Sequence, residues 1–269
     1  MKKILIPTDF SPVADNALQY AIEIGAEFKS MLYLYHTYYI NKVDYDLNLS
    51  EDEQPFKKRL ERKMGLTELK FSEKIKHKEL SIKTFVERGD IPALFKIIAK
   101  KQGVNLIVMG SKGASGLNKV IFGSVAATAL EMAKVPVLVI PPELSFRPIK
   151  QIVIAIDGKK ISKHILFPLQ ELAIKFKAKV IILNVNSETK KETEQVSNIS
   201  FEGIETSFRE VPMNNNINET INEFIEKGDY DLLCMIRREK SFFQSIFQRS
   251  ITKAQVFSNQ VPLLVLPEE

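Results

Sequence analysis

Short apolar runs alternate with amphipathic stretches along the first half of the chain. Continuous apolar runs of about five residues are typical of strands that are buried on both faces. The spacing therefore predicts five buried strands in this half, over residues 4–7, 31–35, 82–86, 106–109 and 135–140.

The stretches between these runs carry apolar residues at helical spacing. Ser11 and Pro12 mark the start of the first helix, because serine caps free N–H groups and proline fits the first helical turn. Further helices are predicted over residues 91–101 and 124–134, and the highly charged residues 51–79 are expected to form one or two exposed helices. Strands that alternate with helices predict a parallel α/β sheet.

The second half of the chain repeats the pattern of the first. Matching residues of the two halves differ in number by a constant offset. The offset is 148 residues near the start of each copy and 126 residues towards its end. The first copy therefore has 22 more residues, which lie between Thr37 and about Leu80. The matching segments are 3–9 with 151–157, 105–109 with 231–235, and 135–141 with 261–267.

A joint with three prolines, residues 141–148, separates the copies and ends any regular element there. We predict two tandem domains, residues 1–142 and 149–269, each a five-stranded, mostly parallel sheet flanked by helices. The last strand of each copy is expected to lie at a sheet edge, and unprotected edges favour pairing.

Composition and charge exclude several classes of protein. Hydrophobic residues make up 45% and charged residues 26%, and no apolar run approaches the ~20 residues of a membrane span. The start does not resemble a signal peptide, so a cytoplasmic protein without membrane association is expected. The net charge of +5 is spread along the chain without a basic stripe, so no nucleic-acid partner is expected. One cysteine and three scattered histidines predict no metal site.

Glycines follow the fourth apolar run at a regular spacing. Gly110 and Gly113 come directly after it, and Gly123 and Ser124 precede a predicted helix. Glycine lets backbone amides approach an anion, and free N–H groups at a helix start favour negative charge. Because open α/β sheets bind ligands at the carboxyl ends of their strands, where Asp9 also lies, we predict a phosphate-binding site there.

The spacing G-x2-G-x9-G-[ST] resembles the nucleotide-binding signature of the universal stress protein family. Residues 7–11, 89–90, 106–111 and 135–139 resemble other motifs of this family, so the resemblance covers residues 1–142 and reaches the second copy through the repeat. It implies a Rossmann-like fold of the adenine nucleotide alpha hydrolase type. It also implies ATP, ADP or AMP as the ligand, although part of the family binds no ATP. Whether Mg²⁺ accompanies the phosphates stays open.

Transferred residue by residue, the resemblance gives roles to individual side chains. Asp9 would contact the adenosine, and Thr37 stands where binders usually have a small apolar residue against adenine. The glycines and Ser124 would hold ribose and phosphates, and Lys112 replaces a histidine of many members and adds positive charge. The expected cofactor-binding residues are Pro7, Thr8, Asp9, Thr37, Met109, Gly110, Ser111, Lys112, Gly113, Gly123, Ser124 and Val125.

Several of these residues have an alternative, purely structural interpretation. Asp9 could cap backbone N–H groups in a turn, and Gly110 could serve turn geometry alone. Lys112 could be a solvated lysine. We expect His36 to be packed rather than to bind a ligand, and Cys234 to be a buried, unreactive thiol.

The second copy lacks the signature glycines. The 126 offset places Ile236 at the position of Gly110. We predict that the second copy has lost nucleotide binding, although Asp157 is retained, Val185 matches Thr37, and Arg237, Arg238 and Arg249 would keep some attraction for anions. At the other signature positions, Glu239 replaces Gly113, Arg249 replaces Gly123 and Ser250 matches Ser124.

The leading functional prediction is a tandem universal stress protein that binds an adenine nucleotide in its first domain and acts as a stress-response regulator or sensor. We do not expect an enzyme, because the signature cradles an anion without an evident general base. The alternatives are a nucleotide-free interaction module and a slow ATPase. The family resemblance further implies pairing through residues 135–140 and 261–266 within one chain, and a homodimer between chains is the further option.

Overall fold

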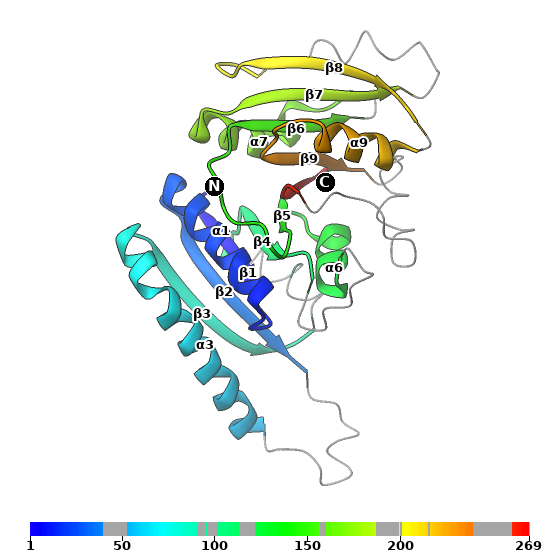
Figure 1. Cartoon of the computed structure of the whole chain (residues 1–269). Coiled ribbons are helices and arrows are strands. Elements are labelled where there is room, and N and C mark those ends of the chain that lie inside the picture. Colours follow the sequence, from blue (N-terminus) through cyan, green and yellow to red (C-terminus); the bar gives the residue numbers. More distant parts are fainter. Residues whose placement is uncertain are drawn as a thin grey trace.

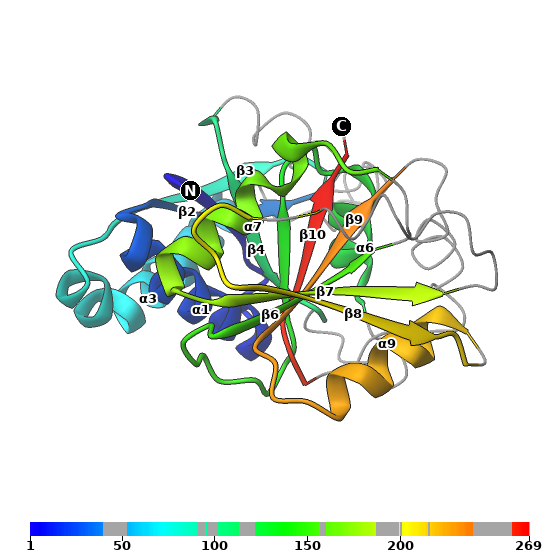
Figure 2. The same cartoon turned by 90° about the horizontal axis from the view of Figure 1, so that it is seen from above.

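A computed structural model describes residues 1–39, 53–90, 95, 102–112, 122–156, 160–186, 199, 201–214, 216–238 and 260–268. Within these residues, ten strands form one sheet in the order β3-β2-β1-β4-β5-β10-β9-β6-β7-β8 (Figures 1 and 2). All neighbouring strands are parallel except β5 and β10. The predicted α/β fold with a mostly parallel sheet is confirmed.

Each of the five apolar runs in the first half forms a strand. One detail of the prediction was wrong: β3 is largely exposed rather than buried on both faces, because it is the outermost strand of the sheet. The strands are β1 (Lys3–Pro7), β2 (Met31–Tyr38), β3 (Ser81–Arg88), β4 (Leu106–Gly110) and β5 (Val137–Ile140).

Three helices of the first half are described: α1 (Pro12–Phe28), α3 (Glu53–His77) and α6 (Ser124–Met132). The predicted start of α1 is confirmed, since Ser11 Oγ accepts the N–H of Ala14 at 3.2 Å. Of the charged residues 51–79, predicted as one or two helices, the described part contains the single helix α3, which contacts β3 (Figure 1). The helix predicted over residues 91–101 lies outside the described residues, apart from the buried Phe95.

The second half has the same strand order, read from the opposite edge of the sheet. Its elements are β6 (Gln151–Ile156), α7 (Lys163–Phe176), β7 (Lys179–Asn186), β8 (Thr206–Pro212), α9 (Ile217–Glu226), β9 (Leu232–Arg237) and β10 (Leu263–Pro267). Cys234 is fully buried in β9, and this burial raises the pKa of its thiol.

Strand register is the same in the two halves. Ile4 of β1 pairs with Leu106 of β4, and Ile152 of β6 pairs with Leu232 of β9, which keeps both sequence offsets. A side-chain interaction is also repeated. Asn105 Oδ1 accepts the N–H groups of Lys2 and Lys3, and Asp231 Oδ2 accepts those of Lys150 and Gln151.

The two halves share a single sheet and both of its apolar layers. β5 and β10 pair antiparallel, with Leu138 opposite Leu264. One buried cluster packs the strands against α1, α3 and α7, and the other packs them against α6 and α9. Because successive strand residues point to opposite faces, Ile4 belongs to the first cluster and Leu5 to the second.

The segment that joins the halves is held against α1. Asn16 Nδ2 donates to the carbonyls of Pro141 (3.2 Å) and Leu144 (3.0 Å), and the Tyr20 hydroxyl donates to the carbonyl of Ser145 at 3.0 Å. These bonds satisfy carbonyls that belong to no sheet or helix. In the part of the chain that the structure describes, no helix is long and apolar enough to cross a membrane.

Candidate functional site

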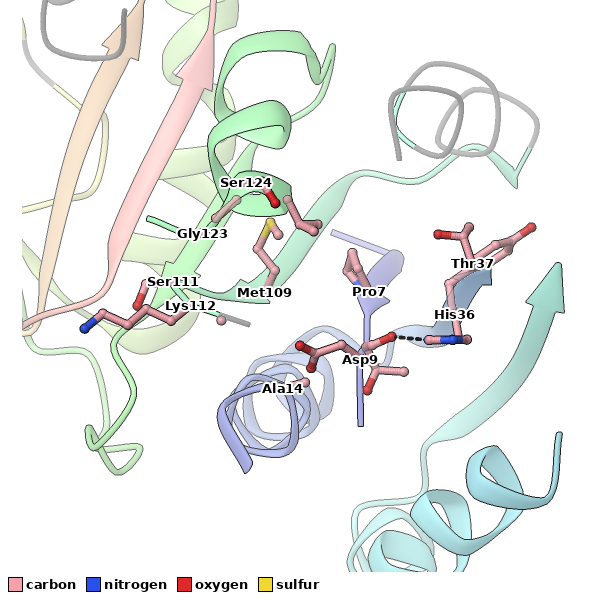
Figure 3. A pocket seen from close by; sticks show the side chains of 15 residues that line it. Pro7, Asp9, Ala14, His36, Thr37, Met109, Ser111, Lys112, Gly123 and Ser124 are labelled. Carbon is pink, nitrogen blue, oxygen red and sulfur yellow. Dashed lines mark hydrogen bonds between the residues drawn. The ribbon is translucent and has the colours of Figure 1, made fainter. Parts of the chain in front are cut away.

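A cavity of about 150 Å³ opens at the carboxyl ends of β1, β2 and β4 (Figure 3). β1 lies between β2 and β4, so the chain leaves it towards one side of the sheet and returns later on the other. Ligands of open α/β sheets bind at such a switch point. The lining residues are Pro7, Thr8, Asp9, Ala14, Tyr35, His36, Thr37, Met109, Gly110, Ser111, Lys112, Gly123, Ser124, Val125 and Ala126.

All of the predicted site residues except Gly113, which lies outside the described residues, line this one cavity. The sequence predicted a strand over residues 31–35, which placed Thr37 just past its end. In the structure β2 extends to Tyr38, so Thr37 lies within the strand. Four lining residues were not predicted: Ala14, Tyr35, His36 and Ala126. Their closeness in sequence to Thr37, Val125 and the start of α1 was the only signal for them.

Asp9 lies in a tight turn between β1 and α1. Its Oδ1 accepts the N–H of Ser11 at 3.0 Å, and Thr8 Oγ1 accepts the N–H of Phe10 at 3.0 Å. Phe10 has a positive φ of 64°, which is uncommon for a bulky residue. Asp9 therefore does have the turn role that was considered as the alternative, and it is exposed beside the cavity (Figure 3).

Gly110 is required by packing in a way that the sequence did not reveal. A Cβ at this position would lie 2.5 Å from Val13 Cγ1 and 3.1 Å from the Val13 carbonyl oxygen. The first turn of α1 therefore packs directly on the end of β4, with no room for a side chain between them. This contact also brings Ala14 to the cavity.

The amino end of α6 forms one wall of the cavity. The Gly123 N–H donates to the carbonyl of Ser111 at 2.7 Å, which ties the start of this helix to the end of β4. Gly123 is the N-cap and offers no side-chain cap, and no acidic residue lies in the first turn. The first N–H groups of a helix have no intrahelical acceptor, so those of Ser124, Val125 and Ala126 are suited to an anion.

Ser111 adds an unsatisfied hydroxyl beside this wall. The residue is 3% exposed, and its Oγ is buried without a hydrogen-bond partner in the described structure. Buried hydroxyls normally have a partner, so the Ser111 hydroxyl is available to bond a ligand or an ordered water in the cavity. Figure 3 shows Ser111 and Lys112 on the opposite side of Asp9 from His36 and Thr37, with the Lys112 side chain directed away from them.

His36 is both packed and part of the cavity wall. The centroid of its ring lies 4.4 Å from the centroid of the Phe10 ring, and its Nδ1 lies 2.7 Å from the carbonyl oxygen of Thr8. Since a carbonyl oxygen only accepts, Nδ1 carries the hydrogen and Nε2 is left as an acceptor in the neutral ring. Burial lowers the pKa of His36, and the charge of Lys63 acts in the same direction. The Thr8 carbonyl and Asp9 oppose this shift.

The second half has different groups at the matching strand ends. Ile236, which replaces Gly110, is buried at the end of β9. The predicted anion attraction of Arg237 is not supported, because its guanidinium donates to the carbonyls of Leu130 (2.8 Å) and Ala133 (2.6 Å) in the first half. Arg238 Nη2 donates to the carbonyl of Lys160, and Arg238 Nε lies 3.3 Å from Glu268 Oε1. The remaining signature positions, Glu239, Arg249 and Ser250, lie outside the described residues, as does Asp157.

With this geometry established, comparison with known proteins identifies the family. The sequence model described as "Universal stress protein family" matches residues 1–141, about half of the chain. The chain belongs to the universal stress protein family. Universal stress protein MJ0531 of Methanocaldococcus jannaschii is 34% identical over 142 residues, which cover 52% of this chain and 81% of the relative. Universal stress protein MJ0577 of the same organism is 31% identical over 153 residues, which cover 52% of this chain and 94% of that protein.

The whole chain also resembles a solved universal stress protein. The crystal structure of a universal stress protein from Archaeoglobus fulgidus superposes with a TM-score of 0.75 and covers 99% of this chain and 98% of that one. At 18% identity this likeness concerns the fold alone. It extends over both halves, whereas the two curated relatives match only about half of the chain.

Proposed function

We propose that this universal stress protein binds an adenine nucleotide in its N-terminal half, residues 1–142, and acts as a regulator or sensor in a stress response. The observation that carries the proposal is the uncapped amino end of α6, which faces the same cavity as the turn of Asp9 at the switch point of the sheet. A helix end without its own cap suits phosphates, and a carboxylate suits ribose hydroxyls.

In the proposed pose the lining would follow a nucleotide from its base to its phosphates. In the proposed pose, adenine lies near Thr37, and the adenosine contacts Pro7, Thr8 and Asp9. The ribose and phosphates would lie along Met109, Gly110, Ser111 and Lys112 and reach Gly123, Ser124 and Val125. Gly113, which lies outside the described residues, is included from its place in the signature alone. The buried Ser111 hydroxyl would gain a partner there. ATP, ADP and AMP all match this chemistry, and Mg²⁺ would enter as a companion of the phosphates.

We propose binding rather than turnover. Asp9 is the only carboxylate among the described lining residues, and one of its oxygens is engaged by the Ser11 N–H. Hydrolysis needs a group that orients or activates the attacking water. Steady-state phosphate release no faster than that of a binding-deficient variant is therefore expected, and faster release would support the alternative of a slow ATPase.

We further propose that the C-terminal half, residues 149–269, is a second domain with a structural or partner-binding role. Ile236 fills the place of Gly110 at its strand end, and the two halves pair through β5 and β10. A pseudo-dimer within one chain would follow, with a dimer of whole chains as a further possibility.

Denaturing the purified chain and identifying the released small molecules tests the nucleotide proposal. We expect adenine nucleotide to be released from the wild type and not from Gly123→Val. Gly123 has φ −65° and ψ 165°, which valine also adopts, so this change adds bulk at the cavity without backbone strain. Gly65→Val is the matched control, because a Cβ there meets no atom within 4 Å. If nucleotide is not released from the wild type and added ATP does not bind to it, the proposal is wrong and the nucleotide-free interaction module is favoured.

A further inference from the structure

The carboxyl end of α6 is capped from the other half of the chain. α6 has no basic residue in its last turn, and its C-cap residue, Ala133, has extended backbone angles instead of the left-handed conformation that often closes a helix. Its last carbonyls therefore need partners from elsewhere. Arg237 binds two of them, with Nη1 2.8 Å from the Leu130 oxygen and Nη2 2.6 Å from the Ala133 oxygen.

Arg237 belongs to the C-terminal half. It is the last residue of β9 and pairs with Pro267 of β10. The 126 offset places it at the position that Ser111 occupies in the first half. The residue at this position thus borders the cavity in the first half. In the second half it extends to the first half and binds the end of α6.

The charge of Arg237 suits the place that it occupies. A cation at the carboxyl end of a helix interacts favourably with the helix dipole, and a planar guanidinium can serve two carbonyls at once. Burial lowers the pKa of Arg237, while Glu131 of α6 raises it, and an arginine side chain stays charged in either case.

The two ends of α6 are linked mechanically. The helix has nine residues, so its ends lie about 13 Å apart and it moves as a short rod. Arg237 holds one end, and residues 124–126 at the other end, whose N–H groups have no intrahelical acceptor, line the cavity. A shift at the first end therefore changes the position of these groups.

We propose that Arg237 is a positioning residue for the nucleotide site of the N-terminal half, so that the C-terminal half sets how tightly this site holds phosphates. The inference rests on the proposed function and extends it. It gives the C-terminal half a defined part in binding, although that half has lost the glycine at its own strand end.

Two substitutions and one control test this role. Arg237→Met removes the charge and both hydrogen bonds, whereas Arg237→Lys keeps the charge and one donor group. Arg147→Met is the matched control, because the polar contacts of Arg147 among the described residues are with the Tyr230 carbonyl, Asp229 and Asp231, and none of them is with α6. The measurements are hydrogen exchange of residues 124–133 without ligand, and calorimetric affinities for ATP and for adenosine.

For Arg237→Met we expect amide exchange in α6 to be about tenfold faster and ATP affinity about tenfold weaker, with adenosine affinity changed less than about threefold. Arg237→Lys should lie between this variant and the wild type, and Arg147→Met should match the wild type in all three measurements. The selective loss of ATP affinity separates positioning of the phosphate end from general destabilisation.

Three results would overturn the inference: α6 exchange as in the control, ATP affinity as in the control, or equal loss of ATP and adenosine binding. A wild-type chain that binds neither ligand would instead contradict the proposed function. The exchange measurement would then still show whether Arg237 orders α6, so the two failures can be distinguished.

Discussion

The two halves of this chain have the same strand pairing and different strand ends. Ile4 pairs with Leu106 just as Ile152 pairs with Leu232, but β4 ends in Gly110 and β9 reaches the buried Ile236 at the equivalent position. Strand pairing in the middle of this sheet depends on short, continuous apolar runs, which many residues can supply. The cavity depends on single positions where a Cβ or a charge changes the geometry.

The start of the first helix shows how one such position acts. α1 begins at Pro12, and its Val13 packs against Gly110, where there is no space for a Cβ. In the second half Ile161, which matches Val13 in sequence, lies before α7, a helix that begins only at Lys163. The larger side chain of Ile236 is thus accompanied by a helix that starts later.

The largest effect is expected when the residue of the second half is placed in the first. Gly110→Ile should lower the free energy of unfolding by about 3 kcal/mol, because its Cβ would overlap Val13, and nucleotide binding should be lost with it. Gly65→Ile, on the exposed side of α3, should change stability by less than about 0.5 kcal/mol. Chemical denaturation measures both, and equal stabilities of the two variants would refute the packing argument.

A negative charge at the start of α6 should separate binding from stability. Ser124→Glu should weaken ATP binding about a hundredfold by like-charge repulsion and raise stability by about 0.5 kcal/mol through the helix dipole. Thr128→Glu, one turn further along the same helix, should change ATP affinity much less. Calorimetry and thermal unfolding provide the two readouts. Unchanged ATP affinity in Ser124→Glu would mean that phosphates do not bind at this helix end.

Asp9 can be tested without removing its turn. In Asp9→Asn, the amide oxygen can still accept the Ser11 N–H, so the melting temperature should change little. We expect affinity for adenosine to fall about tenfold, because the charged acceptor for the ribose is lost. If affinity is retained in Asp9→Asn, Asp9 acts only as a turn residue.

The smallest effect should come from His36. Its pKa is lowered in the folded state by burial, so the unfolded chain binds more protons as the pH falls below about 6.5. The stability that depends on the neutral ring is complete above this pH and is lost as the pH decreases towards the folded-state pKa. Melting temperatures between about pH 5 and 7 should therefore depend on pH less steeply in His36→Gln than in the wild type. Identical slopes would contradict this role.

Much of the fold could be predicted because apolar runs and caps are local signals. The five strands of the first half, the cap at Ser11 and the family resemblance all come from contiguous residues. The exposure of β3 could not be predicted, because it depends on which strand is the outermost one of the sheet. Two features of the site, the need for glycine at position 110 and the reach of Arg237 to α6, depend on contacts between segments far apart in sequence.

The difference between the halves is tested most directly by the number of nucleotides bound per chain. Calorimetric titration of the full-length chain with ATP should give one site per chain in the wild type, and Ser124→Glu should weaken that site about a hundredfold. Two sites per chain, or a site of unchanged affinity in Ser124→Glu, would contradict the assignment of nucleotide binding to the N-terminal half alone.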